Sequence, residues 1–273
     1  MQNKSIIIIC GDPESTFNEI LIKTLKDKVF KKVKYPVIII GSKKLFQNEL
    51  KKLKKKINLQ NFNNQIKLLK KKVYLIDIPL DLKNLTLIKK NLYIEKSFQA
   101  GLNLIKENKS LAIINGPISK TTFLKGKYNG ITEYLAFKTG ASNEVMLIYN
   151  DKLSVSPITT HIPINKVAQK IKKQNIVNNI KSINNFYKKF LKIKPKIAVT
   201  GLNPHCETFS GKNIEKTEIS PAIKTLKENK INVSGPFSAD TIFLESNRGN
   251  YDVIVGMYHD QVLGPMKTIF GFN

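Results

Sequence analysis

Histidine carries both acid–base and metal-binding chemistry, and this sequence has only three copies in 273 residues. His161 lies in SPITTHIP, His205 in AVTGLNPHCE and His259 in VGMYHDQ, so each follows a short β-type run beside a proline or glycine turn. Neutral imidazoles bind Zn²⁺ and other divalent ions, and three of them leave coordination positions for a substrate. For one histidine alone, a hydrogen-bonding role in a loop is the better interpretation. For the three together, a metal site and separate hydrogen-bonding roles in loops stay equally open.

The stretch that carries His259 gathers further reactive groups. The apolar run from Tyr251 to Val255 predicts a buried strand, which we expect to open into a loop. That loop holds His259, Asp260, Gln261 and, slightly later, Lys267. An imidazole, a carboxylate and an ammonium group within nine positions predict the edge of an active site.

Two other turns follow predicted strands, at Gly11-Asp12-Pro13 and Gly116-Pro117. Open α/β sheets bind ligands at such strand ends, but neither turn is the GxGxxG of a standard dinucleotide site. Lys120 could meet a phosphate at a helix N-terminus, and a solvated lysine is the simpler alternative. Asp240, in GPFSADT, would either orient a ligand or cap the helix after it.

The composition is strongly basic, with a formal net charge of +26, yet Arg248 is the only arginine. Base and phosphate recognition normally draws on the planar arginine fork. The lysines are instead spread along the chain together with many Asn and Ile residues. We therefore interpret them as solvated helix faces and expect no nucleic-acid partner, although an inactive, basic nucleic-acid-binding protein stays as the alternative from another class.

Membrane and secretory classes are disfavoured. No apolar run reaches the length of about eighteen residues that a membrane span needs, and the first residues lack a signal peptide's apolar region and cleavage site. Cys10 and Cys206 form neither a disulfide framework nor a CxxC motif. We expect a soluble cytoplasmic protein with reduced cysteines.

Short apolar runs alternate with amphipathic segments, which predicts an α/β protein with a mostly parallel sheet. A hairpin of the segments 145–149 and 153–158 predicts a mixed patch, and no linker marks an internal boundary. The other predicted strands are 5–10, 36–40, 73–78, 110–115, 197–201 and 251–256, and the predicted helices are 15–28, 43–54, 91–108, 132–139, 164–193 and 219–229.

Several short motifs, taken together and in order, are more specific than any of them alone. They resemble the 4-hydroxythreonine-4-phosphate dehydrogenase family over essentially the whole chain, with TTHIP, NPH and MYHDQ as the most diagnostic parts. The motifs are GDP at 11–13, NGPISK at 115–120, GITEYLA at 130–136, TTHIP at 159–163, GLNPHCE at 201–207, PAI at 221–223, GPFSADT at 235–241 and MYHDQVLGPMK at 257–267.

This resemblance implies a fold like that of the isocitrate and isopropylmalate dehydrogenases, in which two subdomains flank a cleft. It also implies a homodimer whose active site is shared across the interface, a nicotinamide cofactor (NAD or NADP) and one divalent cation (Zn, Mg or Co). The whole chain, 1–273, would form a single catalytic unit of two subdomains.

The family's functional residues map onto positions of this chain. Its metal-binding histidines fall on His161, His205 and His259, one of them reaching the ion from the partner subunit. Its substrate-binding threonine and lysine fall on Thr132 and Lys267. Lys267 is also our candidate for the catalytic base, because a nearby metal charge would depress its pKa. Asp240 is the second catalytic candidate.

The implied reaction is the oxidation of 4-phosphohydroxy-L-threonine to 2-amino-3-oxo-4-phosphooxybutanoate, which decarboxylates to 3-amino-2-oxopropyl phosphate in pyridoxal 5'-phosphate biosynthesis. The family has a histidine where this chain has Ile131, so a paralogous threonate or erythronate 4-phosphate dehydrogenase stays open. The family also continues for several tens of residues beyond the position of Asn273. From this we expect a fragment or a truncated reading frame, with poor folding or little activity unless that segment is supplied.

Overall fold

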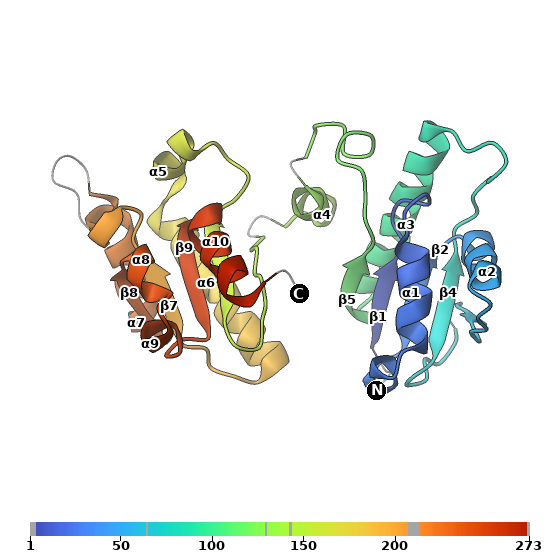
Figure 1. Cartoon of the computed structure of the whole chain (residues 1–273), viewed down its shortest axis with the longest axis horizontal. Coiled ribbons are helices and arrows are strands. Elements are labelled where there is room, and N and C mark those ends of the chain that lie inside the picture. The colour runs from blue at the N-terminus through green and yellow to red at the C-terminus, as the bar shows by residue number, and fades with distance from the viewer. Residues whose placement is uncertain (1–3, 64, 129, 142–143, 207–212, 272–273) are drawn as a thin grey trace. The chain divides into compact units, whose positions relative to one another are not determined.

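The structure is a computed structural model that describes the chain except for residues 1–3, 64, 129, 142–143, 207–212 and 272–273. The chain divides into two compact units, residues 1–139 and 140–273. Each unit has its own parallel sheet with helices on both faces (Figure 1). The boundary between the units comes directly after helix α4, which ends at Thr139. No linker rich in Pro, Gly or Ser marks it, so the composition of the sequence does not reveal it.

The first unit contains a sheet with strand order β3-β4-β2-β1-β5, in which every pair is parallel. Its strands are β1 (Ser5–Ile9), β2 (Val37–Gly41), β3 (Gln60–Asn61), β4 (Val73–Asp77) and β5 (Ser110–Asn115). Its helices are α1 (Phe17–Lys26), the 3₁₀ helix η1 (Val29–Lys32), α2 (Lys43–Lys52), α3 (Leu87–Lys106) and α4 (Ile131–Thr139).

Strand β1 explains why this sheet needs helices on both sides. Figure 1 shows α3 on one face of this sheet and α1 and α2 on the other. Ile7 and Ile9 belong to the cluster that includes residues of α3, whereas Ile8 and Cys10 belong to the cluster that includes residues of α1 and α2. A strand that is apolar on both faces is the pattern of a parallel sheet covered on both sides.

The second unit contains a sheet with strand order β6-β9-β7-β8, also parallel throughout. Its strands are β6 (Ser154–Thr159), β7 (Ile197–Thr200), β8 (Val233–Phe237) and β9 (Val253–Tyr258). Its helices are η2 (Ile164–Lys166), α5 (Val167–Lys170), α6 (Lys173–Phe186), the π-helix η3 (Tyr187–Leu191), η4 (Pro204–Cys206), the π-helix η5 (Glu215–Ile219), α7 (Ser220–Glu228), α8 (Ala239–Ile242), α9 (Glu245–Arg248) and α10 (His259–Phe270).

Strands β7 and β9 form the interior of this second sheet. Val199 and Val255 pack against α6 and α7, whereas Ala198 and Ile254 pack on the opposite side with α8 and α10. The layered α/β architecture with parallel sheets confirms the predicted fold class.

Three local predictions are wrong. The segment 145–149 is no hairpin strand: its antiparallel pairing is one isolated bridge between Ile148 and Val155. The helix predicted over 164–193 is divided, because Ile171 and Lys172 adopt extended backbone between α5 and α6. The loop predicted after β9 is helix α10, which continues through Pro265.

Strand β8 escaped prediction altogether. It contains Gly235 and Pro236, both of which are disfavoured inside strands. Gly235 is nevertheless required, because a Cβ there would lie 2.3 Å from the carbonyl oxygen of Val199 on the neighbouring β7.

Candidate functional site

The sheet of the second unit collects four of the predicted residues at one edge. Parallel strands end on the same side of a sheet, where ligands of open α/β folds bind. In the spatial order β6-β9-β7-β8, the residues that follow the strand ends are His161, His259, His205 and Asp240. Residues far apart in the sequence are therefore placed along one row.

His161 and His259 are neighbours, with 6.0 Å between their ring centroids. Thr159 and Tyr258, which precede them, are paired across β6 and β9. Two imidazoles bound to one ion place their ring centres roughly 5–6 Å apart, given metal–nitrogen bonds of about 2.1 Å. The donor pair thus fits two coordination positions of a single divalent cation.

The ring of His259 contacts the residue that follows it. Its Nδ1 lies 2.7 Å from Oδ1 of Asp260, which accepts a hydrogen bond from the tautomer that carries its proton on Nδ1. This leaves Nε2 as the lone-pair donor, which is the arrangement of a metal-binding histidine oriented by a carboxylate.

His205 lies in the short helix η4 with a left-handed backbone (φ 56°) and faces Asp240. The pKa of the Asp240 carboxyl is lowered, first by the hydrogen bond from the Ser238 hydroxyl (2.6 Å) and then by the nearby His205. Asp240 is exposed at the start of α8. It is therefore an ionised acceptor beside the histidine row.

The loop that carries His205 is held by a buried carboxylate. Glu215 is 2% exposed, and its Oε1 accepts hydrogen bonds from the backbone N–H groups of Leu202 (2.9 Å) and Asn203 (2.8 Å). Glu215 is not among the residues predicted from the sequence. The available signal was its spacing of four from the buried Ile219, which places a charged residue on the apolar face of the helical segment.

Within the part of the chain that the structure describes, no group of three His, Cys, Asp or Glu side chains could hold a metal ion. The His161–His259 pair therefore supplies part of a ligand set, and His205 stands beside Asp240 instead of completing it.

Lys267 does not lie beside the histidines. It is exposed on the last part of α10, eight residues after His259, which corresponds to about 12 Å along the helix axis. The predicted base and His259, the one predicted metal ligand on α10, are thus separated by about two helical turns.

The remaining predicted positions belong to the first unit. Thr132 is exposed in the first turn of α4. Lys120 is also exposed, but the residues after it form turns, so the helix N-terminus expected there is absent from residues 120–128.

The loops after β1 and β5 approach each other through two glycines. A Cβ on Gly11 would lie 2.4 Å from the Pro117 carbonyl oxygen, and one on Gly116 would lie 2.4 Å from the Cys10 carbonyl oxygen. The backbone N–H of Asp12 donates to the same Pro117 oxygen at 2.8 Å. An open cavity of about 260 Å³ borders these loops.

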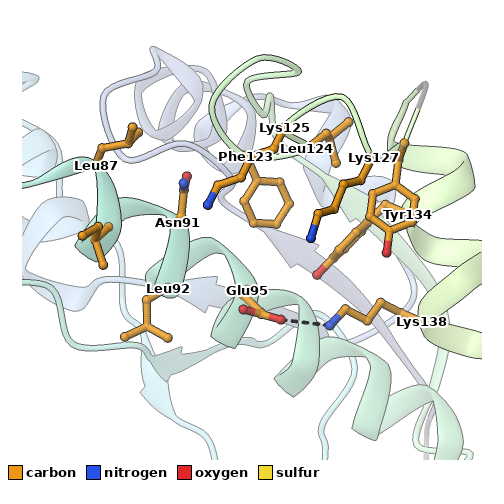
Figure 2. Close-up of a pocket in the computed structure, with 12 residues that line it drawn as sticks. Leu87, Asn91, Leu92, Glu95, Phe123, Leu124, Lys125, Lys127, Tyr134 and Lys138 are labelled. Carbon is orange, nitrogen blue, oxygen red and sulfur yellow. Dashed lines mark hydrogen bonds and ion pairs between the residues drawn. The ribbon is translucent and has the colours of Figure 1, made fainter.

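A larger cavity of about 430 Å³ lies between α3, α4 and the loop that joins β5 to α4. Figure 2 shows Lys125 and Lys127 reaching toward α3, while Lys138 forms an ion pair with Glu95 at 2.9 Å. Tyr134 and Phe123 pack edge to face beside them. Lysine is so frequent in this chain that its presence in the cavity does not identify a ligand.

Comparisons with known proteins agree with this architecture. The sequence profile of the family described as "Pyridoxal phosphate biosynthetic protein PdxA" matches residues 32–273. A 4-hydroxythreonine-4-phosphate dehydrogenase of Sulfurihydrogenibium sp. is 35% identical over 97% of this chain and 83% of that protein. A D-threonate 4-phosphate dehydrogenase of Salmonella typhimurium is 29% identical over 98% of this chain and 85% of that protein.

A solved structure supports the same relationship. The crystal structure of a 4-hydroxythreonine-4-phosphate dehydrogenase from Burkholderia phymatum has a TM-score of 0.83 and 28% sequence identity, and the match covers 99% of this chain and 84% of that one. In the described part of this chain, no helix combines the length and the apolar character needed to cross a membrane.

Proposed function

Because the chain belongs to the PdxA family of pyridoxal phosphate biosynthetic proteins, we propose that it oxidises 4-phosphohydroxy-L-threonine with NAD or NADP as the hydride acceptor. The observation that carries this proposal is the His161–His259 pair, which stands at the carboxyl edge of a parallel sheet in one row with Asp240. Relatives named as 4-hydroxythreonine-4-phosphate dehydrogenases support the assignment as an enzyme that acts on a CH–OH group.

In the proposed reaction, the secondary alcohol loses its O–H proton to a base and its C–H hydride to the nicotinamide ring. The β-keto acid 2-amino-3-oxo-4-phosphooxybutanoate then loses CO₂ to give 3-amino-2-oxopropyl phosphate. A divalent cation (Zn, Mg or Co), when bound at the histidines, would act as a Lewis acid that lowers the pKa of the substrate hydroxyl.

We assign the metal-binding role to His161, His259 and His205. The first two are supported by their separation and by the contact of the His259 ring with Asp260. One of the three imidazoles would reach the ion from the second subunit of a homodimer, in which the active site is shared. This dimeric arrangement rests on the family resemblance.

Our first candidate for the proton acceptor is Asp240, whose exposed carboxylate at the start of α8 lies near His205. Lys267, the base that the family resemblance implies, stays a catalytic candidate and a substrate-binding residue on the ground of its position in the family motif. Its place two turns along α10 suits contact with a remote anionic group of the substrate better than proton transfer at the metal. Thr132 is assigned to substrate binding on the same family ground.

We place the enzyme in the cytoplasm, and the two cysteines without a disulfide framework agree with a reducing compartment. The proposed partners are thus a small phosphorylated hydroxy-amino acid, a nicotinamide cofactor and a second copy of the chain.

A second candidate substrate is threonate or erythronate 4-phosphate. It is favoured by Ile131, which begins α4 and packs partly buried against an aromatic cluster. An isoleucine can neither donate to an anion nor carry charge, so the substrate contact made by the family's histidine is missing. A relative named as a D-threonate 4-phosphate dehydrogenase agrees with this alternative.

The test is NAD⁺ or NADP⁺ reduction with each of the two substrates, after chelation and with Zn²⁺, Co²⁺ or Mg²⁺ added back. We expect metal-dependent turnover of 4-phosphohydroxy-L-threonine that is lost in His161→Ala and kept in Asn165→Ala, a matched exposed position nearby. Turnover that survives both chelation and His161→Ala would overturn the metal assignment. Turnover of the threonate ester alone would establish the second candidate.

A further inference from the structure

Gln261 is a buried amide at the point where the histidine-bearing elements meet. It lies in the first turn of α10, two residues after His259, and is 8% exposed. Its Oε1 accepts hydrogen bonds from the Thr200 hydroxyl (2.9 Å) and from the backbone N–H of Met257 (2.7 Å). Its Nε2 donates to the Gly201 carbonyl oxygen at 2.8 Å.

These three hydrogen bonds connect the ends of β7 and β9 at a point where the two strands are no longer joined by backbone hydrogen bonds. The ladder between β7 and β9 pairs Ile197 with Val253 and ends at Val199 and Val255. Thr200 and Gly201 belong to the continuation of β7, and Met257 belongs to β9. The amide of Gln261 therefore links the two strands past the end of their backbone pairing, at the edge that carries the site.

The link continues to His205 through close packing. A Cβ on Gly201 would lie 2.7 Å from Sγ of Cys206, so the loop after β7 folds back onto its own beginning. His205 directly precedes Cys206 in this loop. Gln261 holds the Gly201 carbonyl, and the Gly201 backbone in turn supports the turn that carries His205.

Room for this amide is built into β9. A Cβ on Gly256 would lie 3.0 Å from Gln261 Oε1 and 2.4 Å from Cγ1 of Val262. The first turn of α10 can approach the strand this closely only over a residue without a side chain. Gly256 thus allows Gln261 to reach across to β7.

We propose that Gln261 is a positioning residue that sets the place of the His205 loop relative to His259. The metal part of this inference rests on the proposed function, whereas the anchoring of the loop does not. A buried donor or acceptor that loses its partner is costly. Removal of the amide would strand the Thr200 hydroxyl, the Met257 N–H and the Gly201 carbonyl, and the loop would then move to find water or other partners.

The variants separate positioning from general stability. Gln261→Met keeps the side-chain length and removes all three hydrogen bonds, and Thr200→Val removes one of them while preserving shape. The matched control is Tyr187→Phe, which deletes a buried hydrogen bond to Ser154 Oγ (2.8 Å) in the same unit. Ser154 begins β6, so this control lies at the opposite edge of the sheet.

The first readout is hydrogen–deuterium exchange of the backbone over residues 200–206, measured by mass spectrometry on the full chain. We expect exchange of this segment to be about tenfold faster in Gln261→Met, with a smaller increase in Thr200→Val, because local opening no longer breaks these bonds. Tyr187→Phe should leave the segment at the wild-type rate. Equal exchange of the segment in Gln261→Met and in Tyr187→Phe would overturn the proposal.

The second readout is the affinity for Co²⁺ alone, measured by calorimetry and visible absorption. Loss of an outer-shell support typically weakens metal binding about 10–100-fold, and we expect a loss in this range for Gln261→Met. Tyr187→Phe should bind Co²⁺ like the wild type. If the wild type shows no His205-dependent Co²⁺ binding, the proposed function fails, and the exchange comparison still decides the role of Gln261.

Discussion

The imidazole rings of His161 and His259 lie 6.0 Å apart because the two strands that deliver them, β6 and β9, are paired neighbours. Each histidine follows the paired positions Thr159 and Tyr258 by one or two residues. The parallel register of β6 and β9 therefore determines the distance between the two rings. A single ion bound between the rings would contact both side chains.

This relationship predicts non-additive effects on metal binding. His161→Ala and His259→Ala should each lower the affinity for Co²⁺ by about 100-fold, and the double variant should lose little more, because ligands of one ion act as a unit. Calorimetric titration of the wild type, the two single variants and the double variant with Co²⁺ completes this double-mutant cycle, with Asn165→Ala as the control. Independent, additive losses would show that the rings do not share an ion.

The buried carboxylate of Glu215 predicts a stability effect. Glu215→Gln places an amide N–H₂ near the backbone donors of Leu202 and Asn203 and should lower the free energy of unfolding by about 1.5–3 kcal/mol, the range for hydrogen bonds to a charged group. Urea denaturation measures the change. Glu228→Gln, which alters an exposed glutamate at the end of α7, is the control and should change stability little. Equal changes in the free energy of unfolding for Glu215→Gln and Glu228→Gln would contradict the proposal that Glu215 holds the loop that carries His205.

The pKa of Cys10 predicts its reactivity. Burial raises the pKa of this thiol from 9.0 to about 12. At pH 8 the thiolate fraction is then about a thousandfold lower than in the unfolded chain, and thiolate is the form that reacts with disulfide reagents. In a Cys206→Ser background we expect negligible labelling of the folded protein and rapid labelling in urea. Rapid labelling of the folded protein would contradict the burial of Cys10.

The same shift in the pKa of Cys10 predicts how the stability of the protein changes at alkaline pH. The folded state keeps the Cys10 proton above the pKa of the unfolded state, so the contribution of this thiol is fully present below pH 9.0 and is lost as the pH rises toward about 12. A Cys10→Ala variant should lack this part of the alkaline destabilisation in melts between pH 8 and pH 11.

The first residue of α4 predicts substrate selectivity. Ile131→His introduces a polar group where the family has one and should raise the ratio of kcat/KM for 4-phosphohydroxy-L-threonine over threonate 4-phosphate by about tenfold or more, because sites built to hydrogen-bond a substrate discriminate strongly. Ile131→Val, which stays apolar, should leave the ratio unchanged. An unchanged ratio in Ile131→His would remove this position from substrate recognition.

Local sequence pattern predicted four of the five strands of the first sheet and missed the two-residue β3. The strand predicted over 110–115 has those bounds in the structure, β1 ends one residue earlier than predicted, and β2 is shifted by one residue at both ends, because short isoleucine-rich runs bounded by glycine are a clear strand signal. Glycine and proline residues, which usually interrupt strands and helices, led to wrong predictions in the second unit. Gly235 and Pro236 concealed β8, and Gly264 and Pro265 concealed α10, since tertiary packing overrode their local preferences.

The candidate site was predicted by residue type and by position after strands, but not by arrangement. Nothing in the sequence states that β9 lies between β6 and β7, and this order makes His259 the neighbour of His161 while His205 stands next to Asp240. The hydrogen-bond partners of Gln261 and Glu215 could not be predicted for the same reason, because tertiary packing determines them, although the spacing of Glu215 from Ile219 marks it as a residue on an apolar face.

The central position of β9 also governs when the second sheet can form during synthesis. β9 pairs with both β6 and β7, yet it follows the other three strands of its sheet in the chain. The five strands of the first unit are complete by Asn115, so that unit can fold on a short nascent chain. Before β9 is synthesised, β6 lacks the strand with which it pairs among the described residues, and its buried Val155 has only the isolated bridge to Ile148. His259, which directly follows β9, is thus brought beside His161 only late in the synthesis of each new molecule.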